Sequence, residues 1–162
     1  MVEIIPANNH IDEFLCLVKE YTDTILAEGE EVARTLAVQH LDDELGHVAA
    51  KYGQPGECMY IARVDGVPAG CGALTRHDAD YCELKRLYVR PPFRAQKLGR
   101  QLLERIIGDA RQLGYRYMRL DTFPFMETAI RLYETYGFRR IGKYNDNPAP
   151  SALFMELTLF RP

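Results

Sequence analysis

The chain has 162 residues, of which 47% are hydrophobic, and a formal net charge of −3. This size is enough for one hydrophobic core, so we expect a single domain over residues 1–162. A general nucleic-acid-binding protein is usually basic, and the negative charge argues against nucleic acid as a partner. No apolar run approaches the roughly 20 residues of a membrane span, and no signal-peptide pattern opens the chain. We therefore expect a cytoplasmic protein with no membrane partner.

Cysteine and histidine positions give no evidence of a metal site. The four cysteines lack zinc spacing and are interpreted as small buried residues in a reducing compartment. His40 and His47 could share a helix face, but no carboxylate cluster accompanies them. We expect no metal. The cysteines are Cys16, Cys58, Cys71 and Cys82.

The first third of the chain reads as a strand and two helices. Residues 2–5 favour a short strand ended by Pro6, and Asn8 or Asn9 is suited to cap the first helix. A break at residues 28–30 separates it from a second predicted helix, which ends before Gly53. The apolar positions that predict the two helices are Ile11, Phe14, Leu15, Val18 and Ile25 for the first and Leu36, Leu41 and Leu45 for the second.

A β-hairpin follows. Residues 59–64 and 67–75 read as strands, and Asp65-Gly66 is a typical hairpin turn. Gly70 and Gly72 within the second strand indicate a bulge or a close backbone approach.

The centre of the chain is a strand, a basic turn and a long helix. Residues 83–89 form the strand and Pro91-Pro92 ends it, because proline lacks the backbone donor. Helical spacing of apolar residues starts at Leu98 and stops before Gly114. The basic turn between them, residues 94–100, coincides with a helix N-terminus, where unpaired N–H groups favour phosphate.

The remaining residues complete a mixed α/β domain. We predict a strand at 117–122, a helix at 126–136, a strand at 140–144, a loop at 145–150 and a last strand at 152–159. A strand–helix–strand unit implies two parallel strands joined by a right-handed crossover. The predicted fold class is α/β, with antiparallel front strands and a parallel central pair.

Two motifs carry a resemblance to the GNAT superfamily of acyl-CoA N-acyltransferases. The basic turn resembles its Arg/Gln-x-x-Gly-x-Gly/Ala motif, with Arg94 in the first position, Gly99 in the last and Lys97 in place of the middle glycine. Residues 129–138 resemble its A-x-x-L-Y-x-x-x-G-F signature, which contains Tyr133. The resemblance covers most of the chain and is weakest before Cys58.

The resemblance implies acetyl-CoA as cosubstrate, bound between the splayed strands 83–89 and 117–122. Its pantetheine arm would pair with the first strand like an added strand, and amides of the basic turn would hold its pyrophosphate. Lys97 is expected to adopt an ordinary helical conformation, with its ammonium reaching a phosphate. The implied cofactor-binding residues are Leu87, Tyr88, Val89, Arg94, Ala95, Gln96, Lys97, Leu98, Gly99 and Arg100.

The implied reaction is direct attack of a primary amine on the thioester in a ternary complex. Tyr133 occupies the family's general-acid position. A phenol is a plausible donor there because its reference pKa of about 10, above the thiol's value of about 8.5, keeps it protonated at neutral pH. Its alternative role is aromatic packing. Glu83 is the candidate base, although it could instead form a surface ion pair with Lys85 or Arg86, and a water chain could replace it.

The acceptor site is predicted from cations on a central strand, where apolar residues normally dominate. Lys85 or Arg86 would hold a carboxylate, which makes the acceptor a small amino-acid-like amine; alternatively, Lys85 only pairs with Glu83. Tyr144 and Asn145 border the predicted acceptor entrance, although turn-forming residues there need no catalytic explanation.

Two functions of different classes remain open. The first is an N-acetyltransferase acting on a small amine, which the complete second motif favours. The second is a catalytically weakened acyl-CoA-binding or protein-interaction module, which Lys97 and Met126 favour because they depart from the family pattern. A Rossmann dinucleotide site is disfavoured because no G-x-G-x-x-G follows the first strand. The oligomeric state stays open, a homodimer included.

Overall fold

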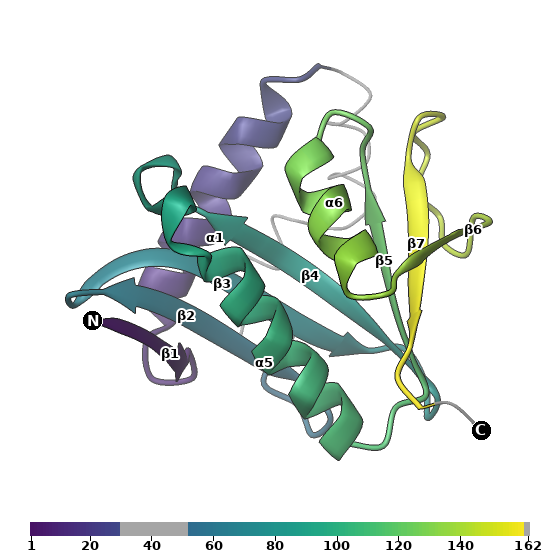
Figure 1. The fold of residues 1–162 in the computed structure, drawn as a ribbon, viewed down its shortest axis with the longest axis horizontal. Helices are drawn as coiled ribbons and strands as arrows, with labels where there is room; N and C mark the ends of the chain where they lie inside the picture. The colour runs from purple at the N-terminus through teal and green to yellow at the C-terminus, as the bar shows by residue number, and fades with distance from the viewer. Residues whose placement is uncertain (30–51, 161–162) are drawn as a thin grey trace.

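The computed structural model describes residues 1–29 and 52–160, and in these residues one seven-stranded mixed sheet forms the centre of the protein (Figure 1). The strand order is β1-β2-β3-β4-β5-β7-β6. This sheet confirms the predicted α/β class with antiparallel front strands and a parallel central pair. The predicted second helix lies outside the described residues.

The first four strands form an antiparallel meander. They are β1 (Val2–Pro6), β2 (Cys58–Val64), β3 (Val67–Arg76) and β4 (Tyr81–Val89). Asp65 and Gly66 join β2 to β3 with φ values of 50° and 82°. Positive φ at both positions is the geometry that a tight two-residue hairpin requires, and it confirms the predicted turn.

Gly70 and Gly72 lie where the sheet meets the helix α5 (Leu98–Gln112). A Cβ on Gly70 would stand 2.7 Å from the carbonyl oxygen of Tyr88, and one on Gly72 would stand 2.9 Å from Ile106 Cδ1. The predicted close backbone approach is therefore confirmed at Gly70. At Gly72 the near atom is the end of a side chain, and the register shift between Cys71 and Ala73 confirms the predicted bulge.

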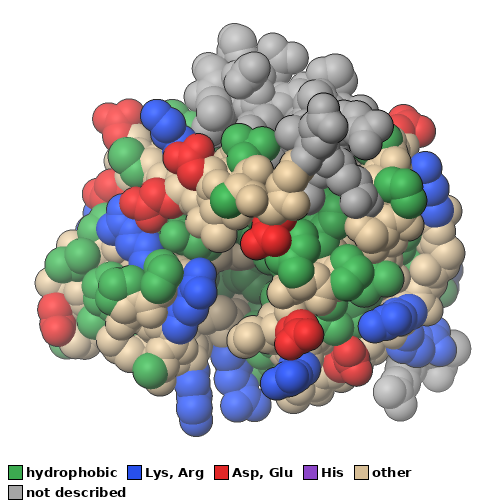
Figure 2. All heavy atoms as spheres, turned by 90° about the horizontal axis from the view of Figure 1, so that it is seen from above, with side chains coloured by type: hydrophobic (Ala, Val, Ile, Leu, Met, Phe, Trp, Pro, Cys, Tyr) green, Lys and Arg blue, Asp and Glu red, His purple; other side chains and the backbone are tan. Residues whose placement is uncertain are grey.

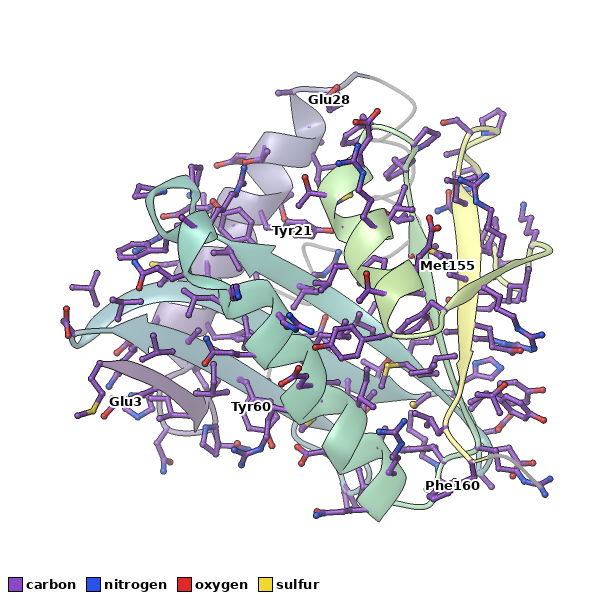
Figure 3. The ribbon with its side chains drawn as sticks, viewed as in Figure 1. Glu3, Tyr21, Glu28, Tyr60, Met155 and Phe160 are labelled. Carbon is purple, nitrogen blue, oxygen red and sulfur yellow. The ribbon has the colours of Figure 1, made fainter. Side chains whose placement is uncertain are left out.

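The helix α5 makes the crossover between β4 and the parallel strand β5 (Tyr117–Thr122). Its predicted apolar face is buried against the sheet, and Gly114 follows its end with φ of 87°. On the same face Tyr60 of β2, labelled in Figure 3, donates a hydrogen bond to Asp109 of α5. The buried residues of the helix are Leu98, Leu102, Leu103, Ile106, Ile107 and Ala110.

The opposite face of the sheet is covered by α1 (Ile11–Leu26), which lies behind the strands in Figure 1. Phe14, Leu17 and Val18 are buried there, while Ile11 and Leu15 are only partly buried. The residue before the helix is His10, and no side chain caps it, so the prediction of an asparagine cap was wrong. Within the described ranges no helix has the length and apolar character to cross a bilayer.

The C-terminal part adds α6 (Glu127–Thr135), β6 (Arg139–Ile141) and β7 (Leu153–Thr158). The strand β7 lies between β5 and β6 and pairs antiparallel with both. The predicted strand 140–144 was too long at its end. Tyr144 instead packs edge-on against Phe154, with 5.5 Å between ring centroids, and turns its hydroxyl toward Glu83.

Candidate active site

The central parallel pair opens into a V. The strands β4 and β5 pair only at Tyr81↔Tyr117, Cys82↔Met118 and Glu83↔Arg119. Beyond these rows β4 continues along β3 and β5 continues along β7, so the two strands diverge toward the top of Figure 1. One edge of β4 from Leu84 onward therefore has no strand partner among the described residues. Ligands bind where strands of a parallel sheet separate at their carboxyl ends.

A cleft occupies this opening. Figure 2 looks down on this end of the molecule and shows a hollow with hydrophobic side chains in its floor and Lys and Arg side chains on one side. Its lining comes from α1, β4, β5, the loop before α6, α6 itself and the loop before β7. The polar residues of the lining are Lys85, Arg86, Asp121, Thr122 and Asn147, with the hydroxyls of Tyr21 and Tyr133.

A bulge in β4 decides which side chains face which side of the sheet. Gly72 alone on β3 stands opposite Arg86 and Leu87, and Arg86 has a left-handed φ of 58°. Consequently Leu87 joins the core under α5, while Glu83 and Lys85 point to the other face. Regular alternation, in which Glu83, Lys85 and Leu87 share a face, therefore ends at the bulge.

The basic turn predicted to bind phosphate, residues 94–100, lies at the junction of two helices. A 3-10 helix, η1 (Pro91–Gln96), leads through Lys97 into α5. Lys97 has φ of 59° and ψ of 31°, so the expectation of an ordinary helical conformation was wrong. Glycine adopts this left-handed region most easily, because it has no Cβ. Lysine therefore occupies the position of the family's middle glycine in a glycine-like conformation.

The N-terminus of α5 presents free backbone donors. No side chain caps this end among the described residues, so the first amides, at Leu98, Gly99 and Arg100, have no intrahelical acceptor. A Cβ on Gly99 would meet Leu132 and Val89 at 3.7 Å, an ordinary contact distance. The packing of the chain itself therefore does not require glycine there, and the missing side chain leaves room for a ligand over the first turn.

Two of the predicted cations already have partners. Arg94 donates from Nε to the Val89 carbonyl at 3.0 Å, which ties the basic turn to the end of β4. Arg100 donates from Nε to the Tyr136 hydroxyl at 2.9 Å and lies 3.5 Å from Glu104. The Arg100 side chain therefore links α5 to the residue that follows α6. The group of Arg100 that remains for a phosphate is its backbone amide.

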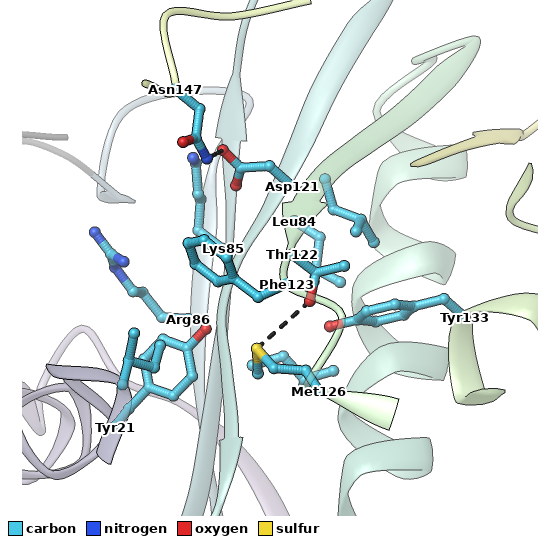
Figure 4. Close-up of a pocket in the computed structure, with 13 residues that line it drawn as sticks. Tyr21, Leu84, Lys85, Arg86, Asp121, Thr122, Phe123, Met126, Tyr133 and Asn147 are labelled. Atoms are coloured by element: carbon cyan, nitrogen blue, oxygen red, sulfur yellow. Dashed lines mark hydrogen bonds between the residues drawn. The ribbon is translucent and has the colours of Figure 1, made fainter. Parts of the chain in front are cut away.

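Tyr133 lies at the inner wall of the cleft. Its ring packs against Phe138 with 5.5 Å between centroids, and its hydroxyl points toward Thr122 and Met126 (Figure 4). Thr122 donates to the Met126 sulfur at 3.4 Å. Burial raises the pKa of the Tyr133 phenol above its ordinary value, so the hydroxyl keeps its proton. Packing and a proton-donating role are compatible in this position.

Glu83 is the centre of a hydrogen-bonded cluster beside the cleft. The Tyr144 hydroxyl donates to its Oε2 at 3.1 Å, Lys85 Nζ lies 3.4 Å away, and His77 Nδ1 lies 4.0 Å away. Burial and the nearby Glu83 charge raise the pKa of Tyr144. The predicted Glu83–Lys85 ion pair is therefore present, and Lys85 and Arg86 also line the cleft.

Sequence reasoning missed Asp121 and Tyr21. Asp121 lies on β5 beyond the last row paired with β4 and accepts hydrogen bonds from Asn145 at 3.0 Å and Asn147 at 3.1 Å. An acidic residue near the carboxyl end of a central strand is the signal that could have found it. Tyr21 reaches the cleft from α1. The sequence of this amphipathic helix contains no signal that separates Tyr21 from residues that only pack against the sheet.

Comparisons with known proteins agree with this geometry. Residues 18–138 match the family model described as the acetyltransferase (GNAT) family. An uncharacterised N-acetyltransferase of Schizosaccharomyces pombe is 39% identical over 151 residues, which span 92% of this chain and 88% of that protein. The N-acetylaspartate synthetase of Danio rerio is 31% identical over 124 residues, 73% of this chain and 44% of that protein.

A solved structure extends the likeness to the fold. The acetyltransferase yncA of Salmonella typhimurium, determined with its cofactor acetyl-CoA, superposes with a TM-score of 0.68 over 99% of this chain and 95% of that chain, at 20% identity. The splayed strands, the glycine-like turn before α5 and the extent of the family match lead to one conclusion. The chain belongs to the GNAT family of acetyltransferases.

Proposed function

We propose that the protein transfers an acetyl group from acetyl-CoA to the primary amine of a small, amino-acid-like acceptor, by direct attack in a ternary complex. The observation that carries the proposal is the divergence of β4 and β5 around a cleft into which the Tyr133 hydroxyl points. Lys85 and Arg86 enter the same cleft from β4.

The described residues fit acetyl-CoA, which supplies an acetyl thioester when bound. The strand edge at Leu87, Tyr88 and Val89 offers backbone groups to the pantetheine arm. The amides of Ala95 to Arg100 would hold the pyrophosphate, whose negative charge the dipole of α5 favours. The Salmonella structure with acetyl-CoA supports the choice of cosubstrate.

The chemistry requires a neutral amine and a proton for the departing thiolate. Glu83 takes the proton of the amine, directly or through water, and its link to Tyr144 fixes the carboxylate in place. Tyr133 donates the proton of its hydroxyl to the sulfur. The raised pKa of Tyr133 keeps that proton on the oxygen at neutral pH, so the protonated donor is present when the thiolate departs.

A carboxylate on the acceptor would meet the cations of β4. Lys85 is 14% exposed and Arg86 is 6% exposed, so a bound anion there would be shielded from water. The relative from Danio rerio is named for a product made from aspartate, an amine that carries carboxylates. Tyr144 and Asn145 border this side of the cleft through their bonds to Glu83 and Asp121.

The alternative, an acyl-CoA-binding module without transfer activity, loses much of its support. Lys97 departs from the family pattern in sequence but keeps the left-handed conformation of the turn. Met126 precedes α6 and accepts the Thr122 hydroxyl, so it is built into the cleft wall. Neither residue disrupts the proposed site.

Thiol release from acetyl-CoA tests the proposal with two pools of amines. One pool contains amino acids and related carboxylated amines; the other contains polyamines and aminoglycosides. Release with the first pool alone supports the proposed function. Release with the second alone keeps the transferase and rejects the carboxylate site. Acetyl-CoA binding without release in either pool supports the binding-module alternative.

Two broader expectations belong to the same proposal. The four cysteines are free, which fits a reducing cytoplasm. A homodimer is a prediction that light scattering of the purified protein would check.

A further inference from the structure

Asp121 stands where β5 leaves β4. It lies two residues beyond Arg119, the last residue of β5 paired with β4, and it lines the cleft. Met118 and Leu120 are buried in the core under α5. Because side chains alternate along a strand, Arg119 and Asp121 point to the opposite face, which is the face of Glu83 and Lys85.

Two amide groups hold one oxygen of this carboxylate. Nδ2 of Asn145 donates to Oδ2 of Asp121 at 3.0 Å, and Nδ2 of Asn147 donates to the same oxygen at 3.1 Å (Figure 4 shows the second bond). Within residues 1–29 and 52–160, the other oxygen, Oδ1, receives no hydrogen bond. The carboxylate is thus oriented by one oxygen while the other stays available at the cleft.

The two asparagines are themselves fixed by the loop before β7. Oδ1 of Asn145 accepts the Asn147 amide at 3.0 Å, and Oδ1 of Asn147 accepts the Ala149 amide at 2.9 Å. Asn147 is only 5% exposed. Since both carbonyl oxygens are engaged by backbone N–H groups, both side chains must direct their NH2 groups toward Asp121.

Charges of opposite sign therefore flank the cleft from its two diverging strands. Lys85 and Arg86 enter from β4, and Asp121 enters from β5. The carboxylate of Glu83, by contrast, already receives Tyr144 and Lys85. A ligand that carries both an ammonium and a carboxylate matches this arrangement of charges.

We propose that Asp121 binds the ammonium group of the acceptor through Oδ1 and thereby selects zwitterionic acceptors. The inference rests on the proposed function, because the β4 cations bind the carboxylate of the same molecule. Asp121 is a specificity-determining residue in this account, and Glu83, directly or through water, takes the proton that the ammonium loses before attack. Asn145 is a positioning residue that acts through Asp121.

Binding to the CoA-saturated protein tests the proposal by calorimetry with two series of probes. One series is L-aspartate, succinate and β-alanine; the other is L-phenylalanine, 3-phenylpropanoate and 2-phenylethylamine. In each series the second compound lacks the ammonium, and the third lacks the α-carboxylate. At least one amino acid should bind the parent protein about tenfold to hundredfold more tightly than its deaminated acid, the size expected of a charge-assisted hydrogen bond.

Asp121→Asn should bring the ratio of the two affinities, amino acid over deaminated acid, close to one. It should leave CoA affinity unchanged. Asp146→Asn is the matched control, since Asp146 is an exposed carboxylate in the same loop and should keep the full preference. Asn145→Ala should lower the preference part of the way and should add nothing in the Asp121→Asn background. A purely structural role for the asparagine pair would change stability without this change in preference.

The proposal would be overturned if Asp121→Asn kept the preference for the amino acid over its deaminated acid. It would also be overturned if the parent protein bound the two compounds equally, or bound neither series. Failure of the proposed function has a different signature. If the parent binds 2-phenylethylamine as tightly as L-phenylalanine, the carboxylate site at Lys85 and Arg86 is wrong, and the preference over the deaminated acid still tests Asp121. β-Alanine keeps one carboxylate and therefore does not decide this point.

Discussion

The hydroxyl of Tyr144 donates a hydrogen bond to Oε2 of Glu83 at 3.1 Å, and so joins the loop after β6 to the strand that carries the proposed base. These residues are 61 positions apart in the chain. The bond holds the carboxylate on the face of the sheet opposite α5, next to the ammonium of Lys85. Three groups that the sequence offers separately thus form one cluster.

Replacing Glu83 with glutamine should lower kcat by about 10²-fold, because the substitution keeps the hydrogen-bonding shape and removes the proton acceptor. Acetyl-CoA affinity should stay unchanged, since Glu83 lies away from the α5 N-terminus. The measurement is steady-state kinetics with the best acceptor from the amine pools. Glu3→Gln, which removes an exposed carboxylate from β1, serves as the control. Parent-like kcat in Glu83→Gln would assign proton removal to water.

Tyr133→Phe should lower kcat by about 10²-fold or more while acetyl-CoA affinity is retained, because only the proton donor is lost. The raised pKa of Tyr133 also predicts a pH dependence. A phenol whose pKa lies above its ordinary value of about 10 stays protonated below that pH, so kcat should not fall through Tyr133 ionisation before about pH 10.

Tyr136→Phe is the matched control for that experiment, since Tyr136 follows the same helix and binds Arg100 and Glu104 outside the cleft. It should leave kcat near the parent value. An equal kcat for Tyr133→Phe and Tyr136→Phe would remove Tyr133 from the acid role and leave it as a packing residue against Phe138.

Lys97→Gly should stabilise the protein by about 0.5–1 kcal/mol in urea unfolding. The left-handed conformation costs a residue with a Cβ roughly 1–2 kcal/mol, and the greater freedom of glycine in the unfolded chain offsets part of the gain. Lys97→Ala keeps the Cβ and should not give this increase. If both variants weaken acetyl-CoA binding equally, the ammonium of Lys97 contributes to affinity. A Lys97→Gly variant less stable than the parent protein would contradict the claim that Lys97 is strained.

Cys58 and Cys82 should resist alkylation in the native protein. Burial raises the pKa of Cys58 and Cys82 to about 12, so at pH 8 roughly one thiol in 10⁴ is the reactive thiolate. Cys16 is exposed. Mass spectrometry after brief iodoacetamide treatment should therefore find Cys16 modified first, and early modification of Cys82 would contradict its burial.

Much of the fold was predictable because its signals are local. The apolar spacing from Leu98 to Ala110 corresponds to the face that α5 buries, and Asp65-Gly66 has the turn geometry its sequence favours. The end of β6 was not predictable in this way. Tyr144 leaves the sheet to reach Glu83 and Phe154, and such long-range contacts leave no periodicity in the sequence.

The candidate site was predictable where a motif marks it and missed where only geometry does. Tyr133, Gly99 and the basic turn belong to motifs, and their placement follows from them. The left-handed conformation of Lys97 follows from the path of the chain rather than from the preference of lysine. Asp121 becomes conspicuous only when Asn145 and Asn147 converge on it, because neither spacing nor composition links the three residues.

The most direct test of the central claim is a competition between L-phenylalanine and 2-phenylethylamine, and between L-leucine and 3-methylbutylamine, for limiting acetyl-CoA. Mass spectrometry would measure the ratio of N-acetylated products in each pair. The account predicts that in at least one pair the acetylated amino acid exceeds the acetylated decarboxylated amine by about tenfold, since only the amino acid engages both strands of the cleft. Excess product from the decarboxylated amine in both pairs, or no acetylated amine at all, would contradict it.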